Sequence, residues 1–327
     1  MFEQDCEGKF MSPQSSPTTE FPEGFKIIEG RKFSEKINYL LPIDESEIRR
    51  LDFQHYIMWQ LMHGNFSAPV EELLEEGIKV LDVGCGTGCW VIEMARDFPN
   101  STFIGVDFSN IFPSPDEIPS NASFIEGNTL NRLPFADDTF DYVYQRYGHI
   151  FILSVNEVAT FNIDKIFIQI HADVLYAKAV ALRELARVAK PGGWVEMFEM
   201  DTKELERPPE NLMSIWTVLN KCATEAFGLD PHYVWQIANM LKENGFEDVE
   251  LDYISIPLGW GGRIGELNAR NLLTAWLAIG PKVAPVLNIG IKEYTELAHS
   301  TMSHMKLNKS WHKAPYAFGR KPLRKRY

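Results

Sequence analysis

The sequence is poor in cysteine and in positive charge, and it has no long apolar run. Its four cysteines include no Cys-x-x-Cys pair, which argues against a disulfide framework and a structural zinc site. The formal net charge of −13 argues against an extended nucleic-acid surface, because phosphate binding needs clustered cations. Residues 271–290 contain Lys282 and two prolines, which makes this stretch a poor membrane span. We therefore expect no metal, nucleic acid or membrane as a partner.

The two ends of the chain carry few signals. Residues 1–5 lack a basic region followed by an apolar core, so we expect neither a signal peptide nor a transit peptide. Residues 11–24 are rich in Ser, Pro, Thr and Glu, and we predict a disordered leader over residues 1–30. Residues 320–327 are basic and form either a nuclear-import address or a solvated end. The predicted location is the cytoplasm, with the nucleus as the alternative.

The most informative stretch is residues 79–88, Lys-Val-Leu-Asp-Val-Gly-Cys-Gly-Thr-Gly. It predicts a strand, a tight loop and a helix N-terminus, a junction that binds the polar end of a nucleotide-like ligand. A pyrophosphate loop has its third glycine five residues after the first, whereas Gly88 falls four after Gly84. Asp82 just before the loop would repel a pyrophosphate but favour a cationic or zwitterionic ligand.

The next two predicted strands end in polar residues. Residues 102–107 end at Asp107, 19 residues past Gly88, where an acid in a βαβ unit accepts hydrogen bonds from both ribose hydroxyls. Phe108 follows and is placed to pack on an adenine face. Residues 123–128 end at Asn128, whose neutral carbonyl oxygen would accept weakly from the adenine amino group.

Two further motifs complete the pattern. Residues 133–144, Leu-Pro-Phe-Ala-Asp-Asp-Thr-Phe-Asp-Tyr-Val-Tyr, predict a turn into a fourth strand. Residues 181–190 have helical spacing, residues 191–193 (Pro-Gly-Gly) stop that helix, and residues 194–199 begin a fifth strand. Residues 245–251 and 314–322 are typical of the sixth strand and of a last antiparallel strand.

These motifs, in this order, resemble the class I S-adenosylmethionine-dependent methyltransferases. The resemblance implies an α/β fold with a doubly wound, mostly parallel, Rossmann-like seven-stranded sheet, and S-adenosylmethionine as cofactor. We predict a methyltransferase domain over residues 31–327, with the cofactor-binding half at 76–200. The predicted cofactor-binding residues are Asp82, Gly84, Cys85, Gly86, Gly88, Asp107, Phe108, Asn128, Thr129 and Gln145. Related enzymes often have Asp where this chain has Asn128.

The segment before the loop narrows the resemblance. Residues 39–55 resemble fungal methyltransferases of the LaeA-like family, which includes a regulator of secondary metabolism in the velvet complex. The resemblance implies an N-terminal helix over the cofactor. Asp44 can cap this helix, and its apolar face would contain Ile48, Leu51, His55 and Met58. For His55 we favour a packing role over catalysis.

Two segments would select the substrate. Residues 257–312 are longer than a hairpin needs, and helical patterns at 264–278 and 291–305 predict a helical cap over the active site. Four aromatics either line an aromatic pocket there or pack in the core: Trp260, Trp276, Trp311 and Tyr294. Residues 147–178 lengthen a connection that is short in the resembling family. This stretch is either a lid or an insertion without function.

Methyl transfer from a sulfonium is an in-line displacement that depends mainly on placement and desolvation. His149, His55 and Asp201 are candidate bases by position, and none belongs to a recognisable catalytic constellation. We predict a methyltransferase that acts on a small molecule or a protein. The alternatives are a weak or inactive regulatory protein that keeps the fold, and a nicotinamide-dependent dehydrogenase. The sequence does not give the acceptor or the oligomeric state.

Overall fold

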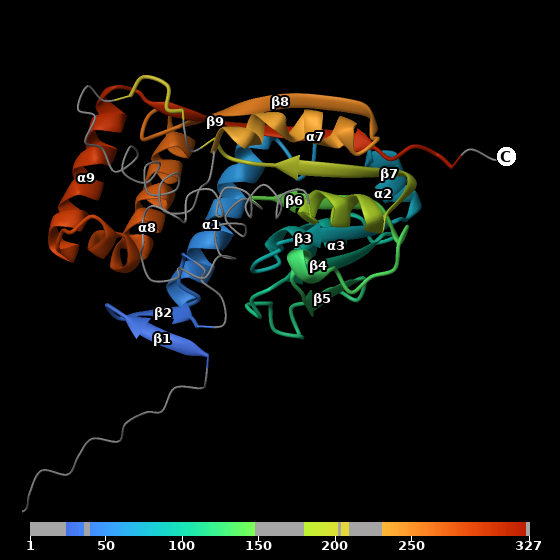
Figure 1. The fold of residues 1–327 in the computed structure, drawn as a ribbon, viewed down its shortest axis with the longest axis horizontal. Helices are drawn as coiled ribbons and strands as arrows, with labels where there is room; N and C mark the ends of the chain where they lie inside the picture. The colour runs from blue at the N-terminus through green and yellow to red at the C-terminus, as the bar shows by residue number, and fades with distance from the viewer. Residues whose placement is uncertain (1–23, 36–39, 148–179, 202–203, 209–230, 325–327) are drawn as a thin grey trace, which may run out of the picture.

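A seven-stranded sheet forms the centre of the molecule in the computed structural model, which describes residues 24–35, 40–147, 180–201, 204–208 and 231–324 (Figure 1). The strand order is β5-β4-β3-β6-β7-β9-β8. The strands are β3 (Lys79–Val83), β4 (Thr102–Asp107), β5 (Ala122–Glu126), β6 (Phe140–Arg146), β7 (Ala189–Phe198), β8 (Glu247–Pro257) and β9 (Trp311–Arg320).

The pairing confirms the predicted fold class. β3 pairs in parallel with β4 and β6, β4 with β5, and β6 with β7. β9 is antiparallel to both β7 and β8. Because parallel strands end at the same edge, the residues after β3, β4 and β6 gather at one edge of the sheet. In Figure 1 the β7 arrow points toward the side of the molecule where α1, α8 and α9 lie.

Helices cover both faces of the sheet. One face packs against helical residues 180–188 and α7 (Ile237–Glu243), which follows the 3-10 turn η2 (Pro231–Gln236); its core includes Val83, Val143 and Leu185. The other face packs against α2 (Glu71–Glu76) and α3 (Cys89–Asp97), with Trp90 stacked on Tyr144 at a centroid distance of 4.3 Å. Side chains alternate between faces along a strand, so Asp82, Tyr144 and Arg146 belong to the α3 face.

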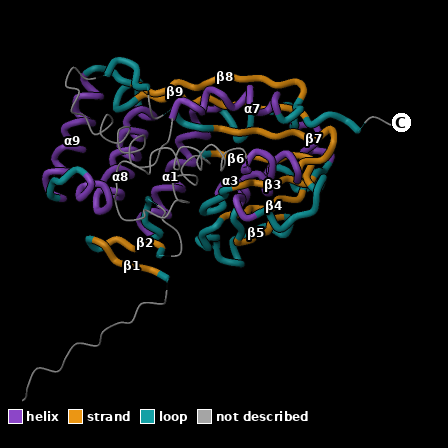
Figure 2. Tube along the Cα trace, viewed as in Figure 1, coloured by secondary structure: helices purple, strands orange, loops and turns teal. Residues whose placement is uncertain are grey.

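The structure corrects part of the predicted leader. Residues 1–23 lie outside the described residues, but β1 (Phe25–Ile28) pairs with β2 (Arg31–Ser34) in a two-stranded sheet. Glu29 and Gly30 both have positive φ, 48° and 73°, which is the geometry of a two-residue hairpin turn. Arg31 holds this hairpin to Asp44 at 2.6 Å. Figure 2 shows the hairpin separate from the large sheet.

The N-terminal helix forms as predicted, and its buried face matches the prediction in part: His55 and Met58 are buried, whereas Leu51 is half-buried. Asp44 caps α1 (Glu45–Met62) by accepting a hydrogen bond from the Glu47 amide. Glu47 and Arg50 are buried although both are charged, whereas Ile48 is only half-buried. Their side chains form an ion pair at 2.7 Å, which makes the burial of both charges tolerable. Hydrophobic spacing alone could not show this pairing.

The predicted helical cap contains α8 (Arg263–Val286) and α9 (Ile291–Leu307). α8 is longer than the 264–278 pattern because the helix continues through Pro281 and Pro285. Trp276 and Tyr294 are buried in the core between these helices, and the Tyr294 hydroxyl donates to the Trp276 carbonyl at 3.0 Å. These two aromatics therefore pack in the core instead of lining a pocket.

The start of β7 differs from the prediction. The helix ends at residue 188, and the strand already begins at Ala189, so the Pro-Gly-Gly sequence lies inside β7. Gly192 has a φ of +85°. A Cβ on Gly193 would come within 2.8 Å of the Asp141 carbonyl oxygen. The glycines thus allow an irregular strand to pass close to β6, where the register shifts between Phe140 and Tyr142.

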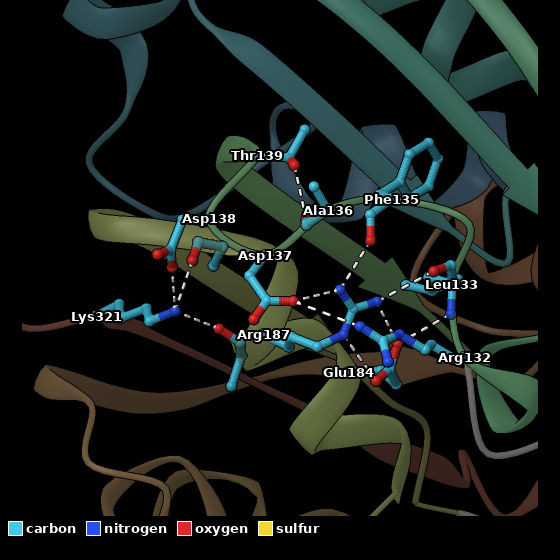
Figure 3. Close-up of polar contacts among 12 residues, drawn as sticks. Arg132, Leu133, Phe135, Ala136, Asp137, Asp138, Thr139, Glu184, Arg187 and Lys321 are labelled. Atoms are coloured by element: carbon cyan, nitrogen blue, oxygen red, sulfur yellow. Dashed lines mark hydrogen bonds and ion pairs between the residues drawn. The ribbon is translucent and has the colours of Figure 1, made fainter.

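The loop before β6 is held by Arg187 of helical residues 180–188, which lie between β6 and β7 in the chain (Figure 3). The guanidinium donates to the carbonyls of Phe135 at 2.8 Å and Leu133 at 3.1 Å. It also pairs with Asp137 at 2.9 Å and Glu184 at 2.7 Å. These contacts lie at the amino end of β6, away from its carboxyl end. Where they meet here, the two sequence motifs therefore stabilise the fold.

We expect Arg187→Met to lower the free energy of unfolding by about 2–4 kcal/mol, because it leaves buried carbonyls and Glu184 without their donor. Arg132→Met is the matched control, since Arg132 is exposed and its ion pair with Asp137 is 3.8 Å long; its effect should stay within about 0.5 kcal/mol. Urea unfolding of both variants tests this. Equal midpoints for the two variants would contradict the assignment.

Candidate functional site

The glycine loop joins β3 to α3 in the predicted way. Gly84, Gly86 and Gly88 have φ of 78°, 55° and 79°, values that favour glycine. The amides of Gly84 and Cys85 donate to the Val106 carbonyl, and the Gly86 amide donates to Asp107 Oδ2 at 2.9 Å. Gly88 is the N-cap of α3. The loop is therefore tied to the end of β4.

The glycines differ in what surrounds them. A Cβ on Gly88 would come within 2.5 Å of the Phe124 ring, whereas a Cβ on Gly86 would meet nothing within 4 Å. Gly88 is thus required for packing. Gly86 instead faces open space, and its amide is bonded to the buried acid Asp107, so a ligand can approach the backbone closely beside that carboxylate.

We expect Gly86→Ala to weaken binding of S-adenosylhomocysteine at least about tenfold, because a methyl group would enter the space beside the loop. Gly245→Ala is the matched control: Gly245 also has positive φ, 84°, and open space around it, but it lies in the turn between α7 and β8. Both variants should lose about 1 kcal/mol of stability from backbone strain. Calorimetry separates them, and equal affinities would contradict a ligand at Gly86.

Asp107 lies at the end of β4 and is 3% exposed. Besides the Gly86 amide, it accepts from the Ser109 amide and hydroxyl, both at 2.8 Å to Oδ1. Burial raises the pKa of this carboxyl above its ordinary value. The Phe108 amide also donates to this carboxylate, so its roughly four acceptor positions are all engaged by the protein. A ligand hydroxyl would therefore have to share or replace one of these contacts.

Asp82 lies one strand away and is 4% exposed. Burial raises its pKa to about 7, with Arg146 acting in the opposite direction and Asp107 adding to the increase. Within the described part of the chain, its carboxyl has no hydrogen-bond donor. An unpartnered buried acid is costly to the folded protein, so Asp82 is suited to a cationic ligand group.

The other predicted cofactor residues are placed as follows. Phe108 is half-buried next to Asp107, and Thr129 begins the short 3-10 helix η1 (Thr129–Asn131). Asn128 caps this helix, with Oδ1 accepting from the Leu130 amide at 2.9 Å. Gln145 is buried, but it pairs with Val83 in the register and so belongs to the face opposite Asp82.

Both cysteines of the loop region are free thiols. Burial raises the pKa of Cys85 well above its usual value. Cys89 has a pKa raised to about 12, chiefly by burial and then by Asp52, whose Oδ1 lies 3.1 Å from its sulfur. Neither thiol is a nucleophile at neutral pH.

The structure narrows the candidate bases. His149 lies outside the described residues. Asp201 is buried and accepts from the Glu204 amide and from the indole of Trp235 at 2.7 Å, contacts that fix loops. His55 is buried between Arg146 and Glu93. Its Nδ1 lies 2.8 Å from Arg146 Nη2, and its Nε2 lies 2.8 Å from Glu93 Oε2. Its pKa is lowered, mainly by burial, so His55 is neutral at pH 7.

Arg146 was missed by sequence reasoning. It ends β6, and Asp82 pairs with Tyr144 two positions before it. The one available signal was alternation: Arg146 has the same parity as Tyr142 and Tyr144, whereas the predicted Gln145 belongs to the other face. The charge of Arg146 lowers the pKa of Asp82 against the larger effect of burial.

Searches of the described residues for metal and membrane features give two results. No group of three or more His, Cys, Asp or Glu side chains in the described ranges could hold a metal ion. No helix there is long and apolar enough to cross a membrane. The segment 147–178 lies outside the described residues apart from Tyr147, whose ring packs edge-on against Phe198.

Comparison with known proteins adds family information. A family model described as a methyltransferase domain matches residues 74–245, more than half of the chain. The chain is 29% identical to "N-methyltransferase sirN" of Leptosphaeria maculans over 255 residues, which are 75% of this chain and 81% of that protein. It is 27% identical to "Secondary metabolism regulator LAE1" of Cochliobolus heterostrophus over 226 residues, 67% of this chain and 66% of that protein.

Two more comparisons differ in coverage. "Secondary metabolism regulator laeA" of Aspergillus flavus is 28% identical, and the match covers 67% of this chain. The chain spans about half the length of that regulator, 54%. Among solved structures, the [4+2]-cyclase SpnF aligns with a TM-score of 0.45 at 18% identity, covering 86% of this chain and 99% of that chain.

Proposed function

The chain belongs to the methyltransferase domain family. On that basis we propose that the loop edge of its sheet binds S-adenosylmethionine and that the protein transfers the cofactor's methyl group to a small molecule or a protein. The observation that supports this most is the open space at Gly86, whose amide is bonded to the buried acid Asp107. When bound, S-adenosylmethionine supplies a sulfonium methyl group to a nucleophile. The residues of the chain bind and orient the reactants and exclude water from the site.

Each residue has a proposed role. Asp107 would accept hydrogen bonds from the ribose hydroxyls, which would share or replace contacts that the protein makes to this carboxylate, and each added donor lowers its raised pKa. Asp82 would stabilise a positive charge on the ligand. Phe108 would cover the adenine face, and Asn128 would accept from its amino group while it continues to cap η1. Gly84, Cys85, Gly88, Thr129 and Gln145 remain proposed as neighbours that shape the site.

Two proposals concern the acceptor. Because one relative is named an N-methyltransferase, a small-molecule amine is the first acceptor class to test. Other relatives are named regulators of secondary metabolism, so the alternative is a weak or inactive protein of this fold that acts through partners. No general base is assigned, because an amine that reacts in its neutral form does not need one.

A labelling experiment distinguishes the proposals. The purified chain is incubated with methyl-labelled S-adenosylmethionine and a fungal-type extract, and products are separated into small molecules and protein. Gly86→Ala serves as the binding-deficient control. If label enters either fraction with the parent chain and not with Gly86→Ala, the protein is an enzyme. Calorimetry that shows binding of S-adenosylhomocysteine without any label transfer favours the regulatory protein, and tight NAD binding alone would overturn the cofactor assignment.

A further inference from the structure

Arg146 presents a buried donor without a partner. Its Nη2 lies 2.8 Å from His55 Nδ1, whereas its Nη1 is buried and has no hydrogen-bond partner within the described part of the chain. Buried guanidinium N–H groups are almost always paired. Because Nη2 is held by His55, the position of Nη1 is set by the protein. Nη1 can therefore donate to an acceptor on a ligand.

Two residues of the helical layer position this guanidinium. Arg146 can only donate, so His55 Nδ1 must accept, and the neutral imidazole then carries its proton on Nε2. Nε2 lies 2.8 Å from Glu93 Oε2, and that oxygen also accepts from Asn65 at 3.2 Å. The Arg146 contact fixes the tautomer, and the Glu93 carboxylate lies beside Nε2, although that contact lacks the geometry of a hydrogen bond. His55 and Glu93 are therefore positioning residues for Arg146.

The unpaired cation lies close to an unpaired anion. Arg146 and Asp82 belong to the same face of adjacent strands, and Asp82 pairs in register with Tyr144, two positions before Arg146. The two side chains form no ion pair with each other among the described contacts. A group that carries an ammonium and a carboxylate on one carbon would satisfy both at once. That group is the head of an α-amino acid.

We propose that Arg146 binds the carboxylate, and Asp82 the ammonium, of the amino-acid end of the cofactor, with His55 and Glu93 holding Arg146 in place. This inference rests on the proposed function, because it takes the ligand to be S-adenosylmethionine. Nη1 is the natural donor, since Nη2 is already engaged with His55. The carboxylate of a methyl acceptor is the competing occupant, and the test below distinguishes it.

The test compares two ligands by calorimetry. One is S-adenosylhomocysteine, and the other is its analogue in which hydrogen replaces the carboxylate. The parent chain should bind the first at least about tenfold more tightly, as expected for a charge-assisted hydrogen bond. Arg146→Met should lose about 10-fold to 100-fold in affinity for S-adenosylhomocysteine and almost nothing for the analogue, so that the preference disappears.

Three further variants make the result specific. Arg146→Lys keeps a cation and should restore part of the preference. His55→Leu removes the support of Arg146 and should reduce the preference while leaving affinity for the analogue intact. Arg49→Met removes an exposed arginine of α1 that pairs only with Glu45 in the described contacts, and it should change neither affinity.

If Arg146 and His55 had a purely structural role, their variants would lose affinity for both ligands to the same extent. That result would overturn the inference. It is also overturned if Arg146→Met binds both ligands like the parent and only the KM for the acceptor increases, because the cation then serves the acceptor. If the parent chain binds neither ligand, the proposed function fails first, and the two failures are thereby distinguished.

Discussion

Replacing Asp107 by alanine is expected to weaken binding of S-adenosylhomocysteine by about 2–4 kcal/mol, because charge-assisted hydrogen bonds to the ribose are lost. This corresponds to roughly 30-fold to 1000-fold in affinity. Asn128→Ala should cost less, about 1 kcal/mol, because it removes a neutral acceptor. Calorimetry on both variants measures the difference.

The structure adds a control that the sequence could not suggest. Asp107 also accepts from Gly86 and Ser109, so alanine loosens the loop as well as removing the charge. Asp107→Asn keeps the shape but removes the charge and replaces one acceptor oxygen by an NH2 donor, and it should lose most of the same affinity. Ser109→Ala removes one protein contact to Oδ1 and should leave binding nearly unchanged. Parent-like binding by Asp107→Ala would show that β4 does not end at the ribose.

The placement of Asp107 and Asp82 was predictable because glycine spacing and apolar runs constrain the backbone strongly. The strand β4 has the predicted bounds, and α3 begins one residue after the predicted start at Gly88. Such local patterns define which residues come to the carboxyl edge of a parallel sheet. These local patterns were sufficient to predict most of the fold and the glycine loop.

The remainder depended on contacts between distant residues. Glu47 and Arg50 are buried together, although charged residues are expected on the solvent side of a helix. Arg146 contacts His55, which lies 91 positions away, and no pattern in either segment indicates this pairing. Sequence reasoning therefore chose Gln145 over Arg146, because it considered strand ends without considering which face each residue occupies.

Asp82→Asn is expected to change stability and binding in opposite directions. In the folded parent chain, burial raises the pKa of Asp82 from 3.8 to about 7. Between these two values, the unfolded chain has lost its proton while the folded chain still holds it. The contribution of Asp82 to stability is therefore complete below pH 3.8 and is lost as the pH rises to about 7.

Asparagine does not titrate, so the variant avoids this loss. At pH 4 the two proteins should have similar free energies of unfolding, and at pH 8 the variant should be more stable by about 2–4 kcal/mol. Glu196 also has a raised pKa, but it is present in both proteins and cancels in the difference. Asp107 is coupled to Asp82, so in the variant its carboxyl ionises more easily, which adds to the stability gain at pH 8. Urea unfolding without ligand, at both pH values, measures the effect.

Binding should respond in the other sense, since the carboxylate that destabilises the empty protein attracts the cationic end of the ligand. We expect Asp82→Asn to bind S-adenosylhomocysteine about 10-fold to 100-fold more weakly at pH 8. Asp116→Asn, at an exposed position, controls for the loss of one negative charge. Unchanged stability at pH 8 would show that Asp82 is hydrated. If Asp82→Asn is more stable at pH 8 and still binds S-adenosylhomocysteine like the parent, Asp82 does not face the ligand. The free energy lost by burying its carboxylate would then make no contribution to binding.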